Sequence, residues 1–163
     1  MTRRVLPRTR TIGLSAASSF AWGMAMVLTV AAGLWLRGRI GTFHLPTIFV
    51  LFFAGGFFGW WLTALIGRQV ARYLRNPLVL GGLAAIGLAA ATVFFTAAFF
   101  ALQYRVFYAQ WHAPVLSRAW MLQFAFTSAS AFYQFAILAL RLYLPLGPVV
   151  LIGGGWAMSR HMR

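Results

Sequence analysis

The chain has 163 residues, with fourteen arginines and no lysine, aspartate, glutamate or cysteine. Hydrophobic residues make up 62% and charged residues 9%, against about 25% charged residues in an average soluble domain. This composition excludes a water-soluble globular protein, whose surface needs more charge, and a disordered tail, which would be poor in apolar residues. Without cysteine, disulfides and thiolate sites are excluded too.

Four apolar stretches exceed the roughly 18 residues that mark a membrane helix. We therefore predict an all-α, polytopic integral membrane protein, a four-transmembrane-helix bundle that forms a single membrane domain over residues 1–163. The expected spans are Thr11–Leu36, Leu45–Gly67, Leu78–Leu102 and Ala119–Leu140. The first stretch is longer than the apolar region of a signal peptide, about 7–15 residues, so it is expected to be a permanent span.

Local signals agree with the starts of three of these spans. Asn76-Pro77 provides a capping side chain followed by proline at the opening of the third helix. Pro46 opens the second helix in the same way, and Ser117 is expected to cap the fourth.

The orientation follows from the distribution of arginines between the two membrane faces. Placing both termini in the cytoplasm leaves ten arginines inside and four outside, with Arg141 at the inner edge of the fourth span. The opposite orientation reverses this ratio. We therefore expect a multi-pass protein of the bacterial inner membrane with cytoplasmic termini.

The segment 142–158 is apolar but contains Pro145, Pro148 and three consecutive glycines. These residues disfavour a helix interior, so an interfacial or re-entrant segment is expected. A short fifth span remains the alternative, and it would weaken the charge asymmetry to eight arginines against six.

The fourth span carries a stripe of polar residues on one helical face, and we call it the polar stripe. Its members are Gln123, Thr127, Ser130 and Gln134, and Arg141 continues the same face seven residues later. Facing lipid would be costly, so the polar stripe should face protein or a wet cavity. It could hold helices together, dock a partner helix or line a pathway.

The third span offers a matching set of polar residues in Thr92, Thr96 and Gln103. If the third and fourth helices run antiparallel, Thr96 is expected at the depth of Thr127. Thr92 is then expected near Ser130.

A basic face is expected beyond the second span, because Arg68, Arg72 and Arg75 recur at helical spacing. The helix is therefore predicted to continue into the cytoplasm. These arginines, together with Arg141, are candidates for binding anionic phospholipid headgroups, although they can equally serve only to set the topology.

Small residues recur every four positions in three of the predicted spans. The rows are Ser15, Ser19 and Gly23; Gly55 and Gly59; and Gly81, Ala85 and Ala89. Such rows allow close approach of helix backbones, within the chain or with a partner.

Catalysis is not expected, because the chain has no carboxylate to act as a base or to orient a histidine. No cofactor or metal is expected either, since His44, His112 and His161 fall in loops or the tail. The arginines are divided between two membrane faces and form no continuous groove for nucleic acid.

The sequence therefore favours a non-catalytic inner-membrane protein, an accessory or scaffolding subunit of a larger membrane complex. Its partners would be anionic phospholipids and an acid-bearing membrane protein, or further copies of itself, since the chain holds no acidic side chain to pair with its arginines. The alternative is a small oligomeric anion or lipid-headgroup transporter or channel, motivated by the arginines at the membrane edges and by the polar stripe.

Overall fold

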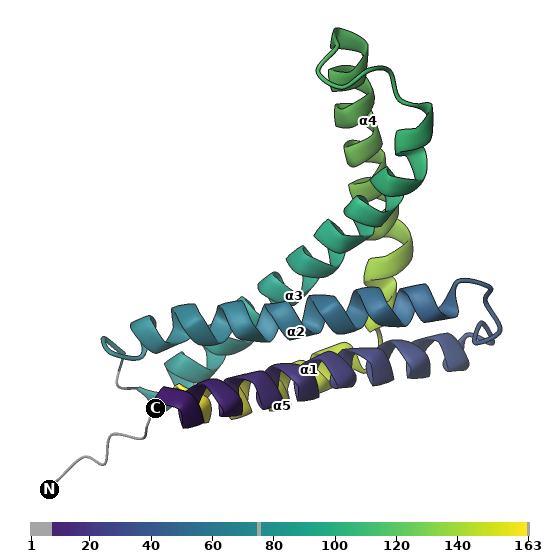
Figure 1. Cartoon of the computed structure of the whole chain (residues 1–163). Helices are drawn as coiled ribbons and strands as arrows, with labels where there is room; N and C mark the ends of the chain where they lie inside the picture. Colours follow the sequence, from purple (N-terminus) through teal and green to yellow (C-terminus); the bar gives the residue numbers. More distant parts are fainter. Residues whose placement is uncertain (1–7, 75, 163) are drawn as a thin grey trace, which may run out of the picture.

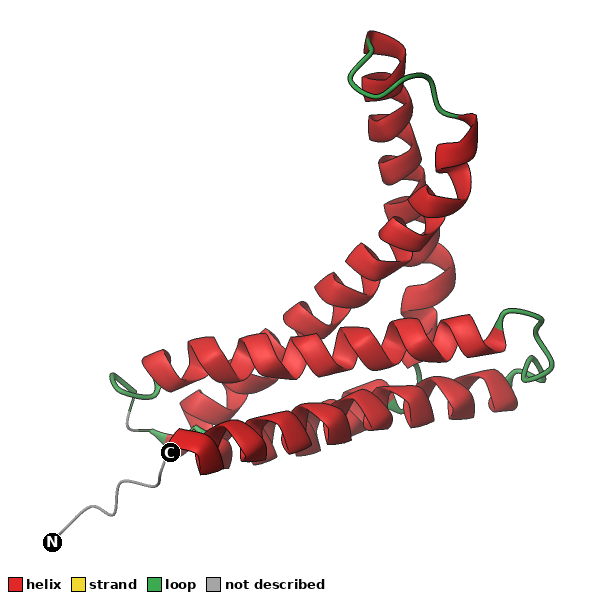
Figure 2. Cartoon of the chain, viewed as in Figure 1, coloured by secondary structure: helices red, strands yellow, loops and turns green. Residues whose placement is uncertain are grey.

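The computed structural model describes residues 8–74 and 76–162, and every regular element in that part of the chain is helical (Figures 1 and 2). The five α-helices are α1 (Arg8–Leu36), α2 (Leu45–Val70), α3 (Pro77–Tyr108), α4 (Arg118–Gln134) and α5 (Gly147–His161). Three short helices complete the chain: the 3₁₀-helix η1 (Ala109–Trp111), the π-helix η2 (Phe135–Ala139) and the 3₁₀-helix η3 (Leu140–Tyr143).

Within the described residues, four helical segments are long and apolar enough to cross a membrane. They are Ala16–Leu36, Leu45–Val70, Pro77–Trp111 and Arg118–Tyr143, the last combining α4, η2 and η3. The predicted all-helical class and the four long apolar helices are confirmed. Large apolar side chains such as Leu28, Ile86 and Phe126 remain 64–71% exposed, as expected of surfaces that face lipid.

The helix starts form as the sequence predicts. The side chain of Asn76 accepts hydrogen bonds from the backbone N–H groups of Leu78, at 2.9 Å, and Val79, at 3.5 Å. The Ser117 hydroxyl accepts one from the N–H of Trp120 at 3.1 Å. Pro46 lies in the first turn of α2, where its missing N–H costs no hydrogen bond.

Helices α1, α2, α3 and α5 form a bundle with two buried clusters. The first cluster joins Trp22 of α1, Trp60 of α2, Leu88 of α3 and Met158 of α5. The second includes Val30, Phe52, Ala97 and, from η2, Phe135. The ends of the bundle differ: the "terminal end" holds the start of α1, the end of α5 and the α2–α3 turn, and the "loop end" holds the α1–α2 loop (Figure 1).

Glycines let the bundle helices approach each other closely. A Cβ atom on Gly59 of α2 would lie 2.6 Å from the Thr92 Oγ1 atom and 2.7 Å from the Thr92 Cα atom of α3. One on Gly23 of α1 would lie 2.9 Å from the carbonyl oxygen of Phe53 in α2. These glycines therefore belong to contacts within the chain. The side chain of Ser15 lies outside the described residues.

The segment after the fourth apolar stretch differs from expectation, because it forms the regular helix α5. Leu144 lies beside Gly33 of α1, Gly154 beside Trp22, and Met162 beside Gly67 at the end of α2. Helix α5 therefore runs antiparallel to α1, from the loop end to the terminal end. Its proline, Pro148, sits in the first turn, where it does not break the helix. Gly154 fits against Trp22 of α1 and Leu88 of α3, and Gly155 fits against Ala85 of α3.

Helix α4 lies outside the bundle and packs on the second half of α3. Figure 1 shows these two helices rising away from α1 and α2 as an arm, with α4 nearly crosswise to both. The "arm" here means residues 103–134. The expected bundle of four parallel and antiparallel spans is therefore replaced by a bundle in which α5 takes the position expected for the fourth span.

The second helix ends earlier than the arginine spacing predicts. Helix α2 stops at Val70, and residues 71–73 form a turn, so Arg72 lies beyond the helix. The residue before Pro77, Asn76, is extended (φ −72°, ψ 119°), so the backbone could not have stayed helical as far as α3. The predicted basic helical face of Arg68 and Arg72 is wrong, and Arg75 lies outside the described residues.

Candidate functional site: an arginine-lined groove at the loop end

The polar stripe of α4 faces the second half of α3. The Gln123 side-chain oxygen accepts a hydrogen bond from the N–H of Ala113 at 2.8 Å, and the Gln134 amide donates to the Tyr104 hydroxyl at 3.3 Å. The Thr127 hydroxyl lies 3.3 Å from the His112 Nε2 atom and also donates to the backbone oxygen of Gln123. These bonds hold the two halves of the arm together.

The pairing of α3 with the fourth apolar stretch differs from the expected register. Thr96 lies 2.8 Å from the hydroxyl of Tyr143, sixteen residues after the expected partner Thr127. Thr92 accepts a hydrogen bond from the Trp22 indole at 3.1 Å, so it faces α1 rather than Ser130. The shift arises because α3 continues to Tyr108 instead of ending near Leu102, which moves the turn and all of α4 outward.

A groove of about 950 Å³ lies between the arm and the loop end of the bundle. Such a volume lies in the range of small-molecule sites, roughly 300–1,000 Å³. We call it the arginine groove. Its charged and polar lining comes from four elements: Arg37, Arg39, Thr42 and His44 in the α1–α2 loop, Thr47 on α2, Gln103, Tyr104 and Tyr108 on α3, and Gln134 and Arg141 on the fourth apolar stretch.

Arg141 lies at the loop end, in contrast to its expected position at the cytoplasmic edge. The Arg37 Nη2 atom donates hydrogen bonds to the backbone oxygens of Arg141, at 3.0 Å, and Leu144, at 3.4 Å. The two arginines therefore share the end of the bundle opposite the chain termini. The cause is again α4, which starts far out on the arm and only returns to the level of Arg37 by residue 141.

The three arginines keep donors available to a ligand. Arg37 uses its Nη2 group on the two carbonyl oxygens, and a guanidinium has further N–H donors on Nη1 and Nε. Arg141 uses its Nε atom on the Leu138 oxygen at 3.3 Å. All three side chains are exposed, and the chain has no acidic side chain to pair with them.

The floor of the arginine groove is apolar and aromatic. Phe52 of α2 and Phe100 of α3 line it, and the rings of Phe100 and Tyr104 stack with their centroids 6.4 Å apart. Tyr104 and Tyr108 continue the aromatic row along α3, with their ring centroids 4.5 Å apart. Cations therefore sit at the rim above a surface that suits hydrocarbon.

The wall formed by the fourth apolar stretch departs from α-helical geometry where it meets the groove. Residues Phe135–Ala139 are a π-helix and Leu140–Tyr143 a 3₁₀-helix. Gln134, Leu138 and Arg141 line the groove from this stretch. A local change of helical pitch re-aims such side chains, and π-helical turns occur frequently at functional sites.

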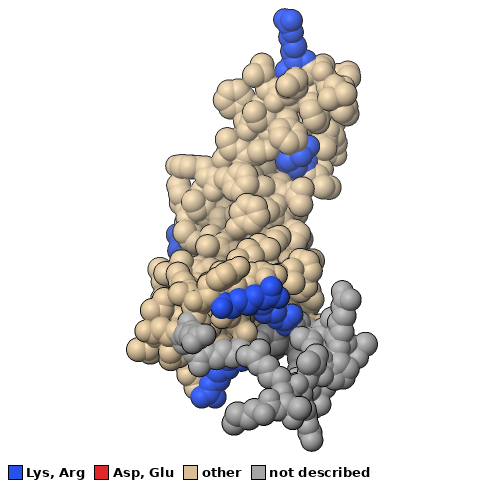
Figure 3. All heavy atoms as spheres, turned by 90° about the vertical axis from the view of Figure 1, so that its left-hand side faces the viewer, with Lys and Arg blue, Asp and Glu red and all other residues tan. Residues whose placement is uncertain are grey.

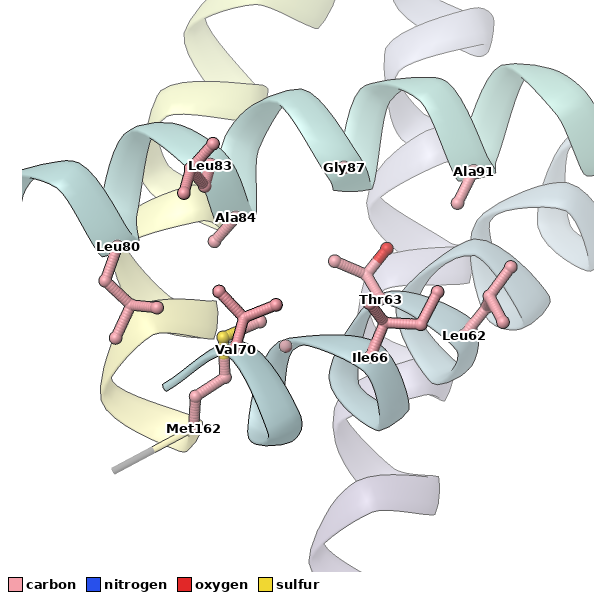
Figure 4. Close-up of a pocket in the computed structure, with 11 residues that line it drawn as sticks. Leu62, Thr63, Ile66, Val70, Leu80, Leu83, Ala84, Gly87, Ala91 and Met162 are labelled. Carbon is pink, nitrogen blue, oxygen red and sulfur yellow. The ribbon is translucent and has the colours of Figure 1, made fainter. Parts of the chain in front are cut away.

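A second, smaller crevice of about 120 Å³ lies at the terminal end, between α2, α3 and α5 (Figure 4). Leu62, Ile66, Leu83 and Met162 contribute apolar atoms, and Thr63 supplies the side-chain oxygen drawn in the close-up. The Thr63 hydroxyl donates to the backbone oxygen of Gly59 at 2.7 Å. The crevice therefore has no polar group directed at a ligand and suits a lipid chain at most.

Among the described residues, no arginine lines the crevice at the terminal end. Figure 3, which views this end, shows basic groups here and others farther along the arm, with no acidic group in view. Arg160 stacks on the Trp156 ring, with 3.7 Å from the guanidinium carbon to the ring centroid. Of the predicted lipid-headgroup arginines that the structure describes, Arg141 lines the arginine groove, whereas Arg68 and Arg72 do not.

Sequence reasoning included Gln103, Gln134 and Arg141 among the candidates but did not bring them together with Arg37 and Arg39. The arginines of the first loop were read only as topology signals. One further signal was available: Phe100, Tyr104 and Tyr108 recur every four residues and mark one aromatic face of α3. Nothing in the sequence places that face opposite the first loop.

Comparison with protein-family models, curated proteins and solved structures finds no match for this chain. The arginine groove is therefore interpreted from its own chemistry.

Proposed function

We propose that this chain is a multi-pass protein of the bacterial inner membrane that binds an amphiphile with an anionic head in the arginine groove. One observation carries the proposal: Arg37, Arg39 and Arg141 converge on a groove with an aromatic floor, in a chain without any acidic side chain. Their counter-ion has to come from outside the chain.

The chemistry of the groove fits a phospholipid. A guanidinium binds a phosphate through two parallel N–H···O bonds, which a single ammonium group cannot do. The apolar floor at Phe52 and Phe100 can cover part of an acyl chain, while the head remains at the rim. The proposed role is binding rather than catalysis, because the chain offers neither a carboxylate nor a thiol.

A binding experiment in lipid nanodiscs tests this proposal. The protein is equilibrated with phosphatidylethanol and phosphatidylcholine of identical chains, which differ in net charge, and the retained lipid is measured by native mass spectrometry. We expect preferential retention of phosphatidylethanol. Each charge near a headgroup contributes about 1 kcal/mol, so Arg39→Gln and Arg141→Gln should each weaken retention about fivefold.

Arg160→Gln is the matched control, because it removes the same charge at the opposite end of the bundle. Equal retention of the two lipids, or equal losses for Arg39→Gln and Arg160→Gln, would contradict the proposal. Arg37→Gln is the less direct variant, since Arg37 also ties α1 to the turn before α5.

A flux assay separates binding from the transport alternative, since Gln134 and Arg141 both line the arginine groove. If the chain moves an anionic headgroup across the bilayer, labelled phosphatidylethanol should change leaflets in proteoliposomes. Gln134→Leu and Arg141→Leu should then slow that flux. Unchanged flux in both variants would leave the groove as a binding site without transport.

A second candidate function, an accessory subunit of a membrane complex, is favoured by the exposure of the arm. Only 11% of the most apolar window of the fourth stretch is buried within the chain, against 44% for α1. Phe126, Met121 and Leu122 of α4 are 60–71% exposed. A partner helix that covered this face would bury large side chains that bring no charge with them.

Site-directed cross-linking tests the accessory role, and the absence of native cysteine makes single-cysteine variants unambiguous. Phe126→Cys on the arm should cross-link to an acid-bearing membrane protein in the native membrane, whereas Ile86→Cys on the bundle should not. A cross-link between two copies would indicate self-assembly instead. Recovery of the chain as a stable monomer with neither product would contradict this role.

A further inference from the structure

The arginine groove does not end at the aromatic row of α3. A second cleft of about 390 Å³ lies on the arm and shares Tyr104 and Tyr108 with the groove. Its other polar lining is uncharged and comes from His112, Thr127 and Ser130, with Gln123 beside them. We call this hollow the side cleft.

We propose that the amphiphile carries a neutral, hydroxylated headgroup beyond its phosphate, such as a glycerol or a sugar, and that this group occupies the side cleft. The inference rests on the proposed function, because the phosphate is taken to lie at the arginines. The two hollows then divide one ligand: the arginine groove takes the anion and the chain, and the side cleft takes the hydroxyl groups.

The hydrogen-bonding groups of the side cleft match hydroxyl groups. The Tyr104 oxygen accepts a hydrogen bond from Gln134, at 3.3 Å, and its own O–H can still donate. The Ser130 hydroxyl is exposed at the edge of the cleft and can both donate and accept. A polyol presents the same mixture of donors and acceptors, so it can satisfy both kinds of group at once.

A quaternary ammonium headgroup is the competing ligand, because the faces of Tyr104 and Tyr108 could attract a cation. The charge of the site argues against it. The cation would lie beside the arginine groove, where Arg37, Arg39 and Arg141 would repel it. The chain has no carboxylate that could offset this repulsion.

The test compares two lipids that share chains and net charge but differ in hydroxyl groups, phosphatidylglycerol and phosphatidylethanol, with phosphatidylcholine as a third lipid of the same chains and no net charge. Phosphatidylglycerol, phosphatidylethanol and phosphatidylcholine are offered together to the full-length protein in nanodiscs, and retention is measured by native mass spectrometry. We expect phosphatidylglycerol to be retained several-fold over phosphatidylethanol. Ser130→Ala, at a residue that lines the side cleft and not the arginine groove, should reduce that ratio toward one while leaving phosphatidylethanol retention unchanged.

Ser128→Ala is the matched control, since Ser128 lies on α4 outside both hollows and should leave the ratio unchanged. Glycerol 3-phosphate, added as a soluble competitor, separates a lipid from a free polyol phosphate. A lipid ligand predicts little displacement at equal concentration, because the soluble compound lacks the chain. Efficient displacement would overturn the assignment to a lipid.

The two proposals fail in different ways. Equal retention of phosphatidylglycerol and phosphatidylethanol, or a preference for phosphatidylcholine, overturns the assignment of the side cleft. The arginine groove would still stand if Arg39→Gln weakened retention of phosphatidylethanol. Loss of all charge preference overturns the groove, and the inference drawn from it falls as well.

Discussion

The bundle and the arm are both helical and apolar, but they are held together by different means. In the bundle, glycines such as Gly55 and Gly59 bring α2 onto the backbone of α3, and Trp22 and Trp60 fill a shared core. In the arm, hydrogen bonds at Gln123 and Gln134 join two helices whose outer faces stay exposed. Stability of the bundle therefore depends on shape, whereas that of the arm depends on a few polar contacts.

The position of the two hollows follows this division. The arginine groove lies where the bundle and the arm meet, and the side cleft lies on the arm alone. A ligand that occupies both hollows would contact the closely packed bundle on one side and the arm, which is held by fewer contacts, on the other. Ligand binding would therefore stabilise the arm more than the bundle.

The largest effect is expected from filling a close contact in the bundle. Gly59→Leu places a side chain against the Thr92 backbone, where even a Cβ atom would lie 2.7 Å from the Thr92 Cα atom. We expect a loss of about 3 kcal/mol in the free energy of unfolding. Thermal unfolding in detergent measures it, with Gly82→Leu as control, because no atom lies within 4 Å of a Cβ on Gly82. Similar losses in both variants would contradict the close contact.

The next effect concerns the core of the bundle. Trp22→Phe removes the indole hydrogen bond to Thr92, 3.1 Å in length, and part of a side chain that is 5% exposed. The expected loss is about 2 kcal/mol, from a cavity and a lost hydrogen bond together. Trp35→Phe, at a position that is 68% exposed, should change the same unfolding transition little. Equal shifts would show that the core is not centred on Trp22.

A smaller effect is expected where the fourth apolar stretch returns to the bundle. Thr96 donates to the Thr92 backbone oxygen at 2.8 Å, so the Tyr143 hydroxyl is the donor in its 2.8 Å contact with Thr96. Tyr143→Phe should cost about 1 kcal/mol of unfolding free energy. Tyr133→Phe, on an exposed side chain, is the control. No difference between the two would indicate that Tyr143 does not bridge these segments.

The smallest effect is expected within the arm. Gln134→Leu removes the hydrogen bond to Tyr104 and should cost about 0.6 kcal/mol, the average for such bonds between membrane helices. Hydrogen exchange should speed up in α4 while α1 and α2 remain unchanged. Gln110→Leu, an exposed position in η1, serves as control. Faster exchange throughout the bundle would mean that the two regions are not separate.

The sequence predicts the helices themselves well because their signals are local. Length and hydropathy define the four apolar segments, and Asn76 and Ser117 cap the helices at the positions expected. The polar stripe of α4 was also expected to face protein, and its described contacts do lie on α3 and the residues after it. Each of these features depends on spacing within a single segment.

The register between segments could not be predicted in this way. The polar residues Thr92 and Thr96 of α3 suggested a register with α4, but they bond to Trp22 of α1 and to Tyr143 instead. The glycines of α5 were read as helix breakers, yet Gly155 fits against Ala85 of α3, where a Cβ atom would lie 2.6 Å from the Ala85 Cβ atom. The arginine groove depends on the register between α3 and α4 and on the helical form of α5. Without these two features, the sequence alone places Arg141 at the opposite end of the molecule.

The length of α5 has a consequence for the surrounding bilayer. Its fifteen residues extend over about 22 Å, less than the roughly 30 Å thickness of a hydrocarbon core. Val149, Ile152 and Trp156 are exposed along it. If the bundle lies in a bilayer, lipid beside a helix of this length has to thin to match it. A thinner patch of bilayer beside α5 brings the lipid headgroups closer to the middle of the membrane. This hydrophobic mismatch would orient the molecule toward thin regions and bias which membrane it enters.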